Sequence, residues 1–238
     1  MKKIGSEAFR ECLSLTSIVI PNGITEIEES VFCNCQKLES IAIPDGVTKI
    51  GDNAFLSCKS LRSVVIPDGV TEIGKAAFFD CTNLESIAIP GSVTKIGDGA
   101  FSNCIKLADD SGFVIFNGVL YSYQGKENTV TVPEDVTKIA LGAFAACTNL
   151  TSVTLPDSVT EIGSLAFYKC DGLTSVNIPD GVTKIGEAAF EGCTGITAIC
   201  TPGSRSWKYC EDNGIPVKAK DSPSPRRLGF FKRIFGKK

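Results

Sequence analysis

The stretch Pro44-Asp-Gly-Val-Thr-Lys-Ile-Gly-Asp-Asn-Ala-Phe-Leu-Ser-Cys-Lys-Ser-Leu-Arg-Ser-Val-Val-Ile66 is a 23-residue unit that recurs, with small changes, along most of the 238-residue chain. A phenylalanine marks the period, at positions 9, 32, 55, 78, 101, 144, 167 and 190, and a cysteine follows each of these phenylalanines by three residues. A fixed period of this length is the signature of stacked repeats. The sequence therefore predicts a solenoid in which each unit forms one rung.

Within one unit, the apolar residues alternate over two short stretches, Val47 to Ile50 and Leu61 to Ile66. Such runs are too short for a helix and favour two strands per rung. The segment Ala54 to Cys58 lies between them, and we expect it to form one short helical turn that points Phe55 and Cys58 inward. Pro-Asp-Gly supplies the corner between units.

One spacing in the phenylalanine column, from Phe101 to Phe144, is 20 residues longer than the repeat. The extra residues include Phe113 to Phe116 and Val119 to Tyr123, two β-rich runs joined by Asn117-Gly118. Asn-Gly between such runs is a strong hairpin signal. We therefore expect an irregular unit with an inserted β-hairpin over residues 108–132.

The pattern I-x-I-P-x-x-V-T-x-I-G-x-x-A-F-x-x-C-x-x-L closely resembles the BspA-like class of leucine-rich repeats over residues 4–202. The resemblance implies a mainly β leucine-rich repeat solenoid, a right-handed, horseshoe-like coil that binds proteins, often as a surface adhesin of bacteria and protists. Residues 1–202 would form this solenoid and residues 203–220 its C-terminal cap. Within the cap, Ser204 to Asn213 has the pattern of a short helix with Ser204 as N-cap.

Charge is distributed along the units in a regular way. The residue after Val-Thr changes sign from unit to unit, through Glu26, Lys49, Glu72 and Lys95, and then through Lys138, Glu161 and Lys184. Opposite charges on neighbouring strands stabilise their pairing, whereas like charges destabilise it. We interpret this column as structural, with the like-charge step from Lys95 to Lys138 falling at the hairpin.

The chain has 11 cysteines and no histidine, a composition that limits its chemistry. Stacked cysteines point the same way, so disulfides are disfavoured, and buried reduced thiols are expected. Without histidine or paired Cys-x-x-Cys motifs we expect no metal site and no cofactor. The absence of histidine also excludes Ser-His-Asp and Cys-His catalysis, so an enzyme is not expected.

Two surfaces are candidates for binding a protein partner. Along the second strands, outward small residues are bordered by the more variable positions Glu39, Arg62 and Glu85. The hairpin gathers aromatic residues of the types favoured at binding hot spots, namely Phe113, Phe116, Tyr121 and Tyr123. The alternative interpretation is that these rings cover neighbouring rungs.

The C-terminal end departs from the repeat. A Pro/Ser linker at 221–225 precedes a basic amphipathic tail at 226–238, which carries six Lys/Arg and no acid, whereas residues 1–221 have a net charge of −9. The tail suggests binding to an anionic membrane surface, a docking helix or a disordered end. Its membrane-contacting residues would be Leu228, Phe230, Phe231, Lys232, Arg233, Ile234 and Phe235. The acidity of the remaining chain disfavours nucleic acid as a partner.

The sequence starts with repeat sequence and shows no secretory signal, so we expect a cytoplasmic protein or one peripheral to the inner membrane face. The leading expectation is a non-catalytic protein-binding scaffold whose tail tethers it to a membrane. The alternative is a cell-surface adhesin whose upstream signal is missing. Since residue 4 enters in the middle of a repeat, the first rung lacks a cap, and edge-to-edge self-association is a further expectation.

Overall fold

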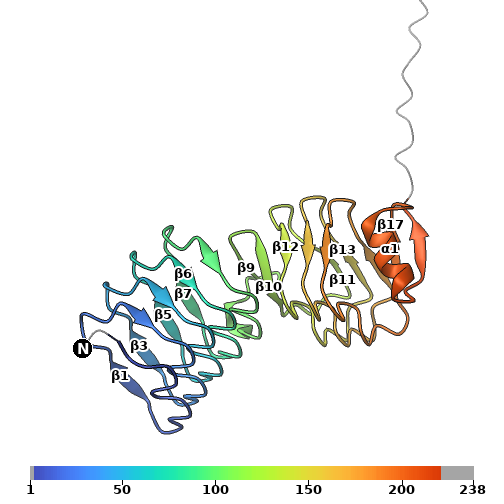
Figure 1. Ribbon diagram of the computed structural model, residues 1–238. Helices are drawn as coiled ribbons and strands as arrows, with labels where there is room; N and C mark the ends of the chain where they lie inside the picture. The colour runs from blue at the N-terminus through green and yellow to red at the C-terminus, as the bar shows by residue number, and fades with distance from the viewer. Residues whose placement is uncertain (1–2, 221–238) are drawn as a thin grey trace, which may run out of the picture.

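The computed structural model describes residues 3–220 and is an elongated stack of rungs (Figure 1). Each regular unit contributes two short strands, one to each of two faces of the stack. Face A denotes the sheets formed by the first strands of the units, and face B those formed by the second strands. The regular units pair in parallel, each residue with its equivalent in the next unit, as in Lys49 with Glu72 and Ser63 with Ser86. The predicted β-solenoid is thereby confirmed.

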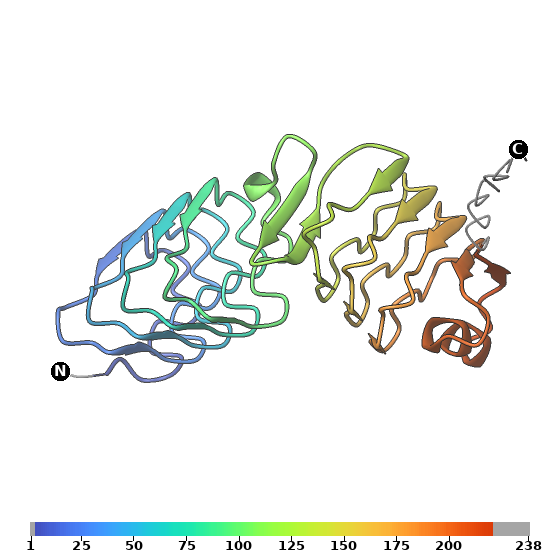
Figure 2. The same ribbon diagram turned by 90° about the horizontal axis from the view of Figure 1, so that it is seen from above.

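The hairpin divides both faces into two sheets, giving an N-terminal and a C-terminal stack (Figure 2). In the N-terminal stack, face A contains β2 (Glu26–Ile27), β4 (Lys49–Ile50), β6 (Glu72–Ile73) and β8 (Lys95–Ile96), and face B contains β1 (Ser17–Val19), β3 (Ser40–Ala42), β5 (Ser63–Val65) and β7 (Ser86–Ala88). In the C-terminal stack, face A contains β9 (Phe113–Phe116), β10 (Val119–Tyr123), β12 (Lys138–Ile139), β14 (Glu161–Ile162) and β16 (Lys184–Ile185). Face B of that stack contains β11 (Thr129–Thr131), β13 (Ser152–Thr154), β15 (Ser175–Asn177), β17 (Thr197–Cys200) and β18 (Val217–Ala219).

The segment between the two strands of a unit differs from the expected helical turn. In the unit of Phe55, both Asn53 and Ser57 have a φ of 55°, in the left-handed region, which is incompatible with a right-handed helix. The N–H groups of Asn53, Phe55 and Ser57 donate instead to carbonyls of the next rung at 2.7–2.8 Å. The prediction of one helical turn per repeat is therefore wrong, because alternate N–H groups along this segment bond the neighbouring rung.

The phenylalanine column forms the centre of the core. From Phe9 to Phe101 successive ring centroids lie 5.1 to 5.6 Å apart with nearly parallel planes, and from Phe144 to Phe190 they lie 4.9 and 5.0 Å apart. Phe32, Phe55, Phe78, Phe101, Phe144 and Phe167 are fully buried. This column is an aromatic spine that every rung shares with its neighbours.

The cysteine column is reduced and has a structural role of its own. All 11 cysteines are free thiols. The Cys58 thiol donates to the carbonyl oxygen of Phe32 in the preceding unit at 3.2 Å, and Cys35, Cys81, Cys104, Cys147, Cys170 and Cys193 make the equivalent contact. Buried reduced thiols are confirmed, and each of these gives a turn carbonyl a donor that a purely apolar side chain would not supply.

The irregular unit is a complete rung rather than a hairpin added to the outside of the stack. β10 pairs with β12 in the usual register, Val119 with Lys138, and antiparallel with β9, so the predicted hairpin is confirmed. The N–H of Tyr123 donates to Ala143 at 2.8 Å, as the N–H of Phe55 does to Ala77 at 2.7 Å. Tyr123 therefore takes the place of the phenylalanine in this rung.

The C-terminal cap contains the predicted helix, α1 (Arg205–Asp212), whose N-cap Ser204 accepts a hydrogen bond from the N–H of Trp207 at 3.1 Å. Cys210 on this helix is fully buried, and β18 pairs with β17 at the edge of the sheet. A single-turn 3-10 helix, Ile105–Leu107, precedes the hairpin. None of the helices within residues 3–220 is long and apolar enough to cross a membrane.

Candidate binding surfaces

The hairpin rings that were candidate binding residues belong to the core. Phe113, Tyr121 and Tyr123 are 7%, 1% and 3% exposed, so a partner could not reach them. Phe116 is half-buried, and its ring lies 4.8 Å from that of Phe101. This burial contradicts a binding role for the buried three and favours the alternative interpretation, since the rings carry the aromatic spine across the irregular unit.

Face B of the N-terminal stack is an uncovered row of small side chains. The outward positions of its strands are exposed, and among them Val19 and Val65 are 86% and 70% exposed. The other members of the row are Ser17, Ser40, Ala42, Ser63, Ser86 and Ala88. An exposed strip of apolar and small polar atoms can contact another protein closely because no long side chain has to move.

Three charged residues border this strip, one from each of three successive rungs. Glu39, Arg62 and Glu85 are all exposed, and backbone bonds between rungs join them, from Arg62 N–H to Glu39 and from Glu85 N–H to Arg62. The Arg62 guanidinium lies 3.9 Å from the Glu85 carboxylate, which also accepts from Lys106 at 2.8 Å. The Lys106 hydrogen bond and charge lower the pKa of Glu85. The structure thus brings the three predicted residues together as a rim along face B.

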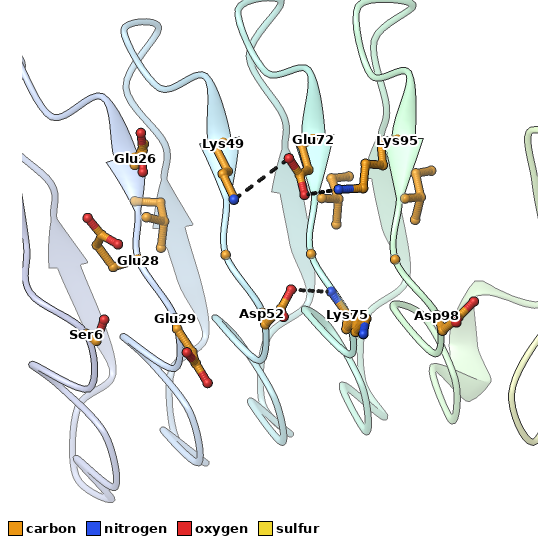
Figure 3. A pocket seen from close by; sticks show the side chains of 16 residues that line it. Ser6, Glu26, Glu28, Glu29, Lys49, Asp52, Glu72, Lys75, Lys95 and Asp98 are labelled. Carbon is orange, nitrogen blue, oxygen red and sulfur yellow. Dashed lines mark hydrogen bonds and ion pairs between the residues drawn. The ribbon is translucent and has the colours of Figure 1, made fainter.

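Face A of the same stack carries a charged groove of about 530 Å³ (Figure 3). One wall is the alternating column of β2, β4, β6 and β8. The other is a second column of mostly charged residues from the following turns, Ser6, Glu29, Asp52, Lys75 and Asp98. The groove was not predicted from the sequence, because alternating charges in one column indicate only pairing between strands.

The floor of the groove consists of glycine backbone. A Cβ atom at Gly74 would lie 2.5 Å from the backbone nitrogen of Asp52, and one at Gly51 would lie 2.7 Å from the carbonyl carbon of Glu28. Glycine at these positions lets neighbouring rungs approach this closely, whereas Glu28 holds the equivalent position beside the first rung. Ala140 takes the equivalent position where the preceding rung is irregular. A glycine column between two charged columns is the signal that could have predicted the groove.

Several charged side chains of the groove already have partners within it. The Glu72 carboxylate lies 2.7 Å from Lys95 and 3.8 Å from Lys49, and its pKa is lowered first by the hydrogen bond from Lys95, against the opposing effect of burial. The Asp52 carboxylate accepts from the backbone N–H of Lys75 at 2.8 Å. A partner in this groove would meet paired charges, whereas face B also offers an exposed strip of small and apolar side chains, so face B is the better candidate surface.

The described residues were also compared with the arrangement of a metal site. Within residues 3–220, no group of three or more histidine, cysteine, aspartate or glutamate side chains is arranged to hold a metal ion. The proposed membrane-binding residues of the tail, at 228 and 230–235, and the linker at 221–225 lie outside the described residues.

Known proteins share both the sequence pattern and the fold. The family model of the BspA type leucine rich repeat region matches residues 2–110 and 115–212, in six copies. A leucine-rich repeat protein from Eubacterium ventriosum is 28% identical with a TM-score of 0.66, and the match covers 83% of this chain but 57% of that one. A leucine rich cell surface protein from Faecalibacterium prausnitzii is 26% identical with a TM-score of 0.52, over 92% of this chain and 76% of that one. A comparison with curated proteins gives no match.

Proposed function

The chain belongs to the BspA-type leucine-rich repeat family, and from this premise we propose that it is a non-catalytic scaffold that binds a partner protein on face B of its N-terminal stack. The observation that carries the proposal is the exposed strip containing Val19 and Val65, bordered by the rim of Glu39, Arg62 and Glu85. Apolar contact along the strip supplies affinity, while the rim charges select the partner. The partner would present basic groups opposite Glu39 and Glu85 and an acidic group opposite Arg62.

Charge inversion of the rim tests this proposal. A partner obtained by affinity capture with the full chain is purified, and its Kd is measured against the variant E39K/R62E/E85K. Because each contact would then face a like charge, we expect binding to weaken by at least about tenfold. The matched control inverts Glu26 and Glu29 in the groove of face A and should bind normally. Equal weakening by both variants, or by the control alone, would move the binding site away from face B.

We further propose that residues 226–238 tether the scaffold to an anionic membrane, which agrees with the basic and apolar residues of that segment. Cosedimentation with anionic vesicles compares the full chain with residues 1–221. The full chain should pellet and the shorter one should not, and equal pelleting would contradict tethering. In this proposal the protein lies in the cytoplasm or at the inner membrane face.

A cell-surface adhesin is the second candidate function, favoured by the similarity to the Faecalibacterium prausnitzii protein, which is described as a cell surface protein. Treatment of intact cells with a protease separates the two locations. Digestion of the protein while the cell membranes are intact would support the adhesin. Protection of the protein until the cells are lysed would support the tethered scaffold.

A further inference from the structure

The rung of Phe101 leaves face B one strand short. In regular units the second strand follows the Leu of the repeat, but after Leu107 the chain turns through residues 108–112 and crosses to face A as β9. Consequently β7 ends one sheet of face B and β11 begins the next, and no strand of the described residues pairs with β11 on the side of the N-terminal stack. A free parallel edge therefore faces the interruption.

The free edge of β11 presents hydrogen-bond donors. Thr129 is in register with Ser152, whose N–H donates toward the preceding rung, to Asn128 at 3.2 Å. The N–H of Thr129 accordingly points toward its own preceding rung, as does that of Thr131 two residues later. Neither N–H finds an acceptor among the described residues. Unpaired donors along an edge are what an added strand binds.

A groove of about 670 Å³ runs along this edge. β11 forms one wall, and the segments 108–113 and 123–127 form the others. Tyr123 lines the groove, is 3% exposed, and has a hydroxyl without a hydrogen-bond partner. Burial raises the pKa of Tyr123, and the backbone N–H of Glu127 acts in the opposite direction. That N–H is not placed to form a hydrogen bond with the hydroxyl. Since Tyr123 is buried, the parts of this groove that a partner can reach are β11 and the exposed residues of the two segments.

The charges of the groove define the partner further. Asp109 is occupied by the chain itself, because its carboxylate accepts from the N–H groups of Ser111 and Phe113, both at 2.9 Å. Asp110, Lys126 and Glu127 are exposed at the walls, and no ion pair joins them to a described residue. The acids outnumber the base, so a partner with basic side chains is favoured.

We propose that the groove along β11 binds an extended, basic polypeptide segment of a partner protein, which adds as the missing strand of face B. Its carbonyl groups accept from the N–H groups of Thr129 and Thr131, and its basic side chains face Asp110 and Glu127. This site is separate from the rim of Glu39, Arg62 and Glu85, so either can fail without the other.

The test uses the full chain and a synthetic probe, the capped octapeptide Lys-Val-Lys-Val-Lys-Val-Lys-Val. We expect saturable binding that slows hydrogen exchange at the amides of Thr129 and Thr131. The peptide with alternate N-methylated residues, which cannot pair along its backbone, and the Glu-Val analogue should bind at least about tenfold more weakly. The variant D110K/E127K should lose the same affinity, whereas the rim variant E39K/R62E/E85K should bind the probe normally.

Three results would overturn the proposal. The first is the absence of probe binding, and the second is binding that leaves exchange at Thr129 and Thr131 unchanged. The third is slow exchange at these amides before peptide is added, which would mean that another part of the chain already occupies the edge. Because D110K/E127K changes only exposed side chains, its thermal stability should match that of the unmodified chain and so separates loss of binding from loss of fold.

Discussion

The Lys138 ammonium group lies 2.7 Å from the Asp98 carboxylate, although the whole irregular unit separates the two residues in sequence. Lys138 also lies 3.5 Å from Glu161 in the following rung. One lysine therefore connects β12 of the C-terminal stack with the last regular rung of the N-terminal stack. β8 and β12 do not pair, because β9 and β10 lie between them, so the like-charge step from Lys95 to Lys138 costs nothing across a strand pair.

Replacing Lys138 should weaken the coupling between the two stacks. For Lys138→Met we expect a lower apparent m value in urea unfolding, because the stacks would begin to unfold separately. The matched control is Lys184→Met, which loses a 2.6 Å pair with Glu161 inside one stack and should keep its m value. Equal m values for the two variants would show that the Lys138 contact does not couple the stacks.

The same contact predicts a dependence on pH. The hydrogen bond from Lys138 lowers the pKa of Asp98 below its ordinary value of 3.8, although burial opposes this. A carboxylate with a lowered pKa stabilises the fold above its ordinary pKa and loses that effect as the pH falls through the lowered one. The unmodified chain should therefore have a higher melting temperature than Asp98→Asn at neutral pH, and the two melting temperatures should converge in strong acid. A difference that persists or grows in acid would contradict this.

The glycine column predicts a position-specific effect of one methyl group. Gly74→Ala should destabilise the fold by about 1 to 3 kcal/mol, because its Cβ would meet the backbone of Asp52 and the rungs would have to separate. Gly91→Ala is the control, since a Cβ there has no atom within 4 Å. Chemical denaturation measures both. If the two variants unfold alike, close approach of the rungs is not the reason for glycine at this position.

The aromatic spine predicts that losing one ring is worse than losing one rung. Phe78 is fully buried between Phe55 and Phe101, with centroid distances of 5.1 and 5.6 Å, so Phe78→Ala should cost about 3 to 5 kcal/mol. Deleting residues 67–89 lets Phe55 stack on Phe101 and puts Lys49 opposite Lys95, a cost of only about 0.2 to 1 kcal/mol. The melting temperature of the deletion variant should be higher than that of Phe78→Ala. The reverse order would contradict this prediction.

The cysteines should differ in their reaction with iodoacetamide at mildly alkaline pH. Burial raises the pKa of Cys35 to about 11 and that of Cys104 to about 12, so almost none of either thiol is ionised. Cys12 and Cys33 are half-buried and should be alkylated first, and fully buried Cys104 only on unfolding. Peptide mapping by mass spectrometry reads out each site. Early alkylation of Cys104 in the folded chain would contradict its burial.

The sequence by itself determined the regular part of this protein. Identical units bury their apolar faces only by stacking in register, so the period alone placed Phe55, Cys58 and the alternating charges of Lys49 and Glu72 in columns. The C-terminal helix was also predictable, since Ser204 supplies a local capping signal. In each case the physical cause lies within one unit or between a residue and its copy 23 positions away.

Tertiary structure alone decided what the irregular residues do. The spacing from Phe101 to Phe144 fits an inserted hairpin as well as a shortened rung, and only the bond from Tyr123 to Ala143 shows that Tyr123 replaces a phenylalanine. The left-handed turns likewise depend on N–H groups that bond the next rung. The free edge of β11 follows from the same choice, because a strand that crosses to face A leaves donors on face B without a neighbour. These features depend on which backbone groups pair between rungs, and the spacing of residues in the sequence does not specify that pairing where the repeat is irregular.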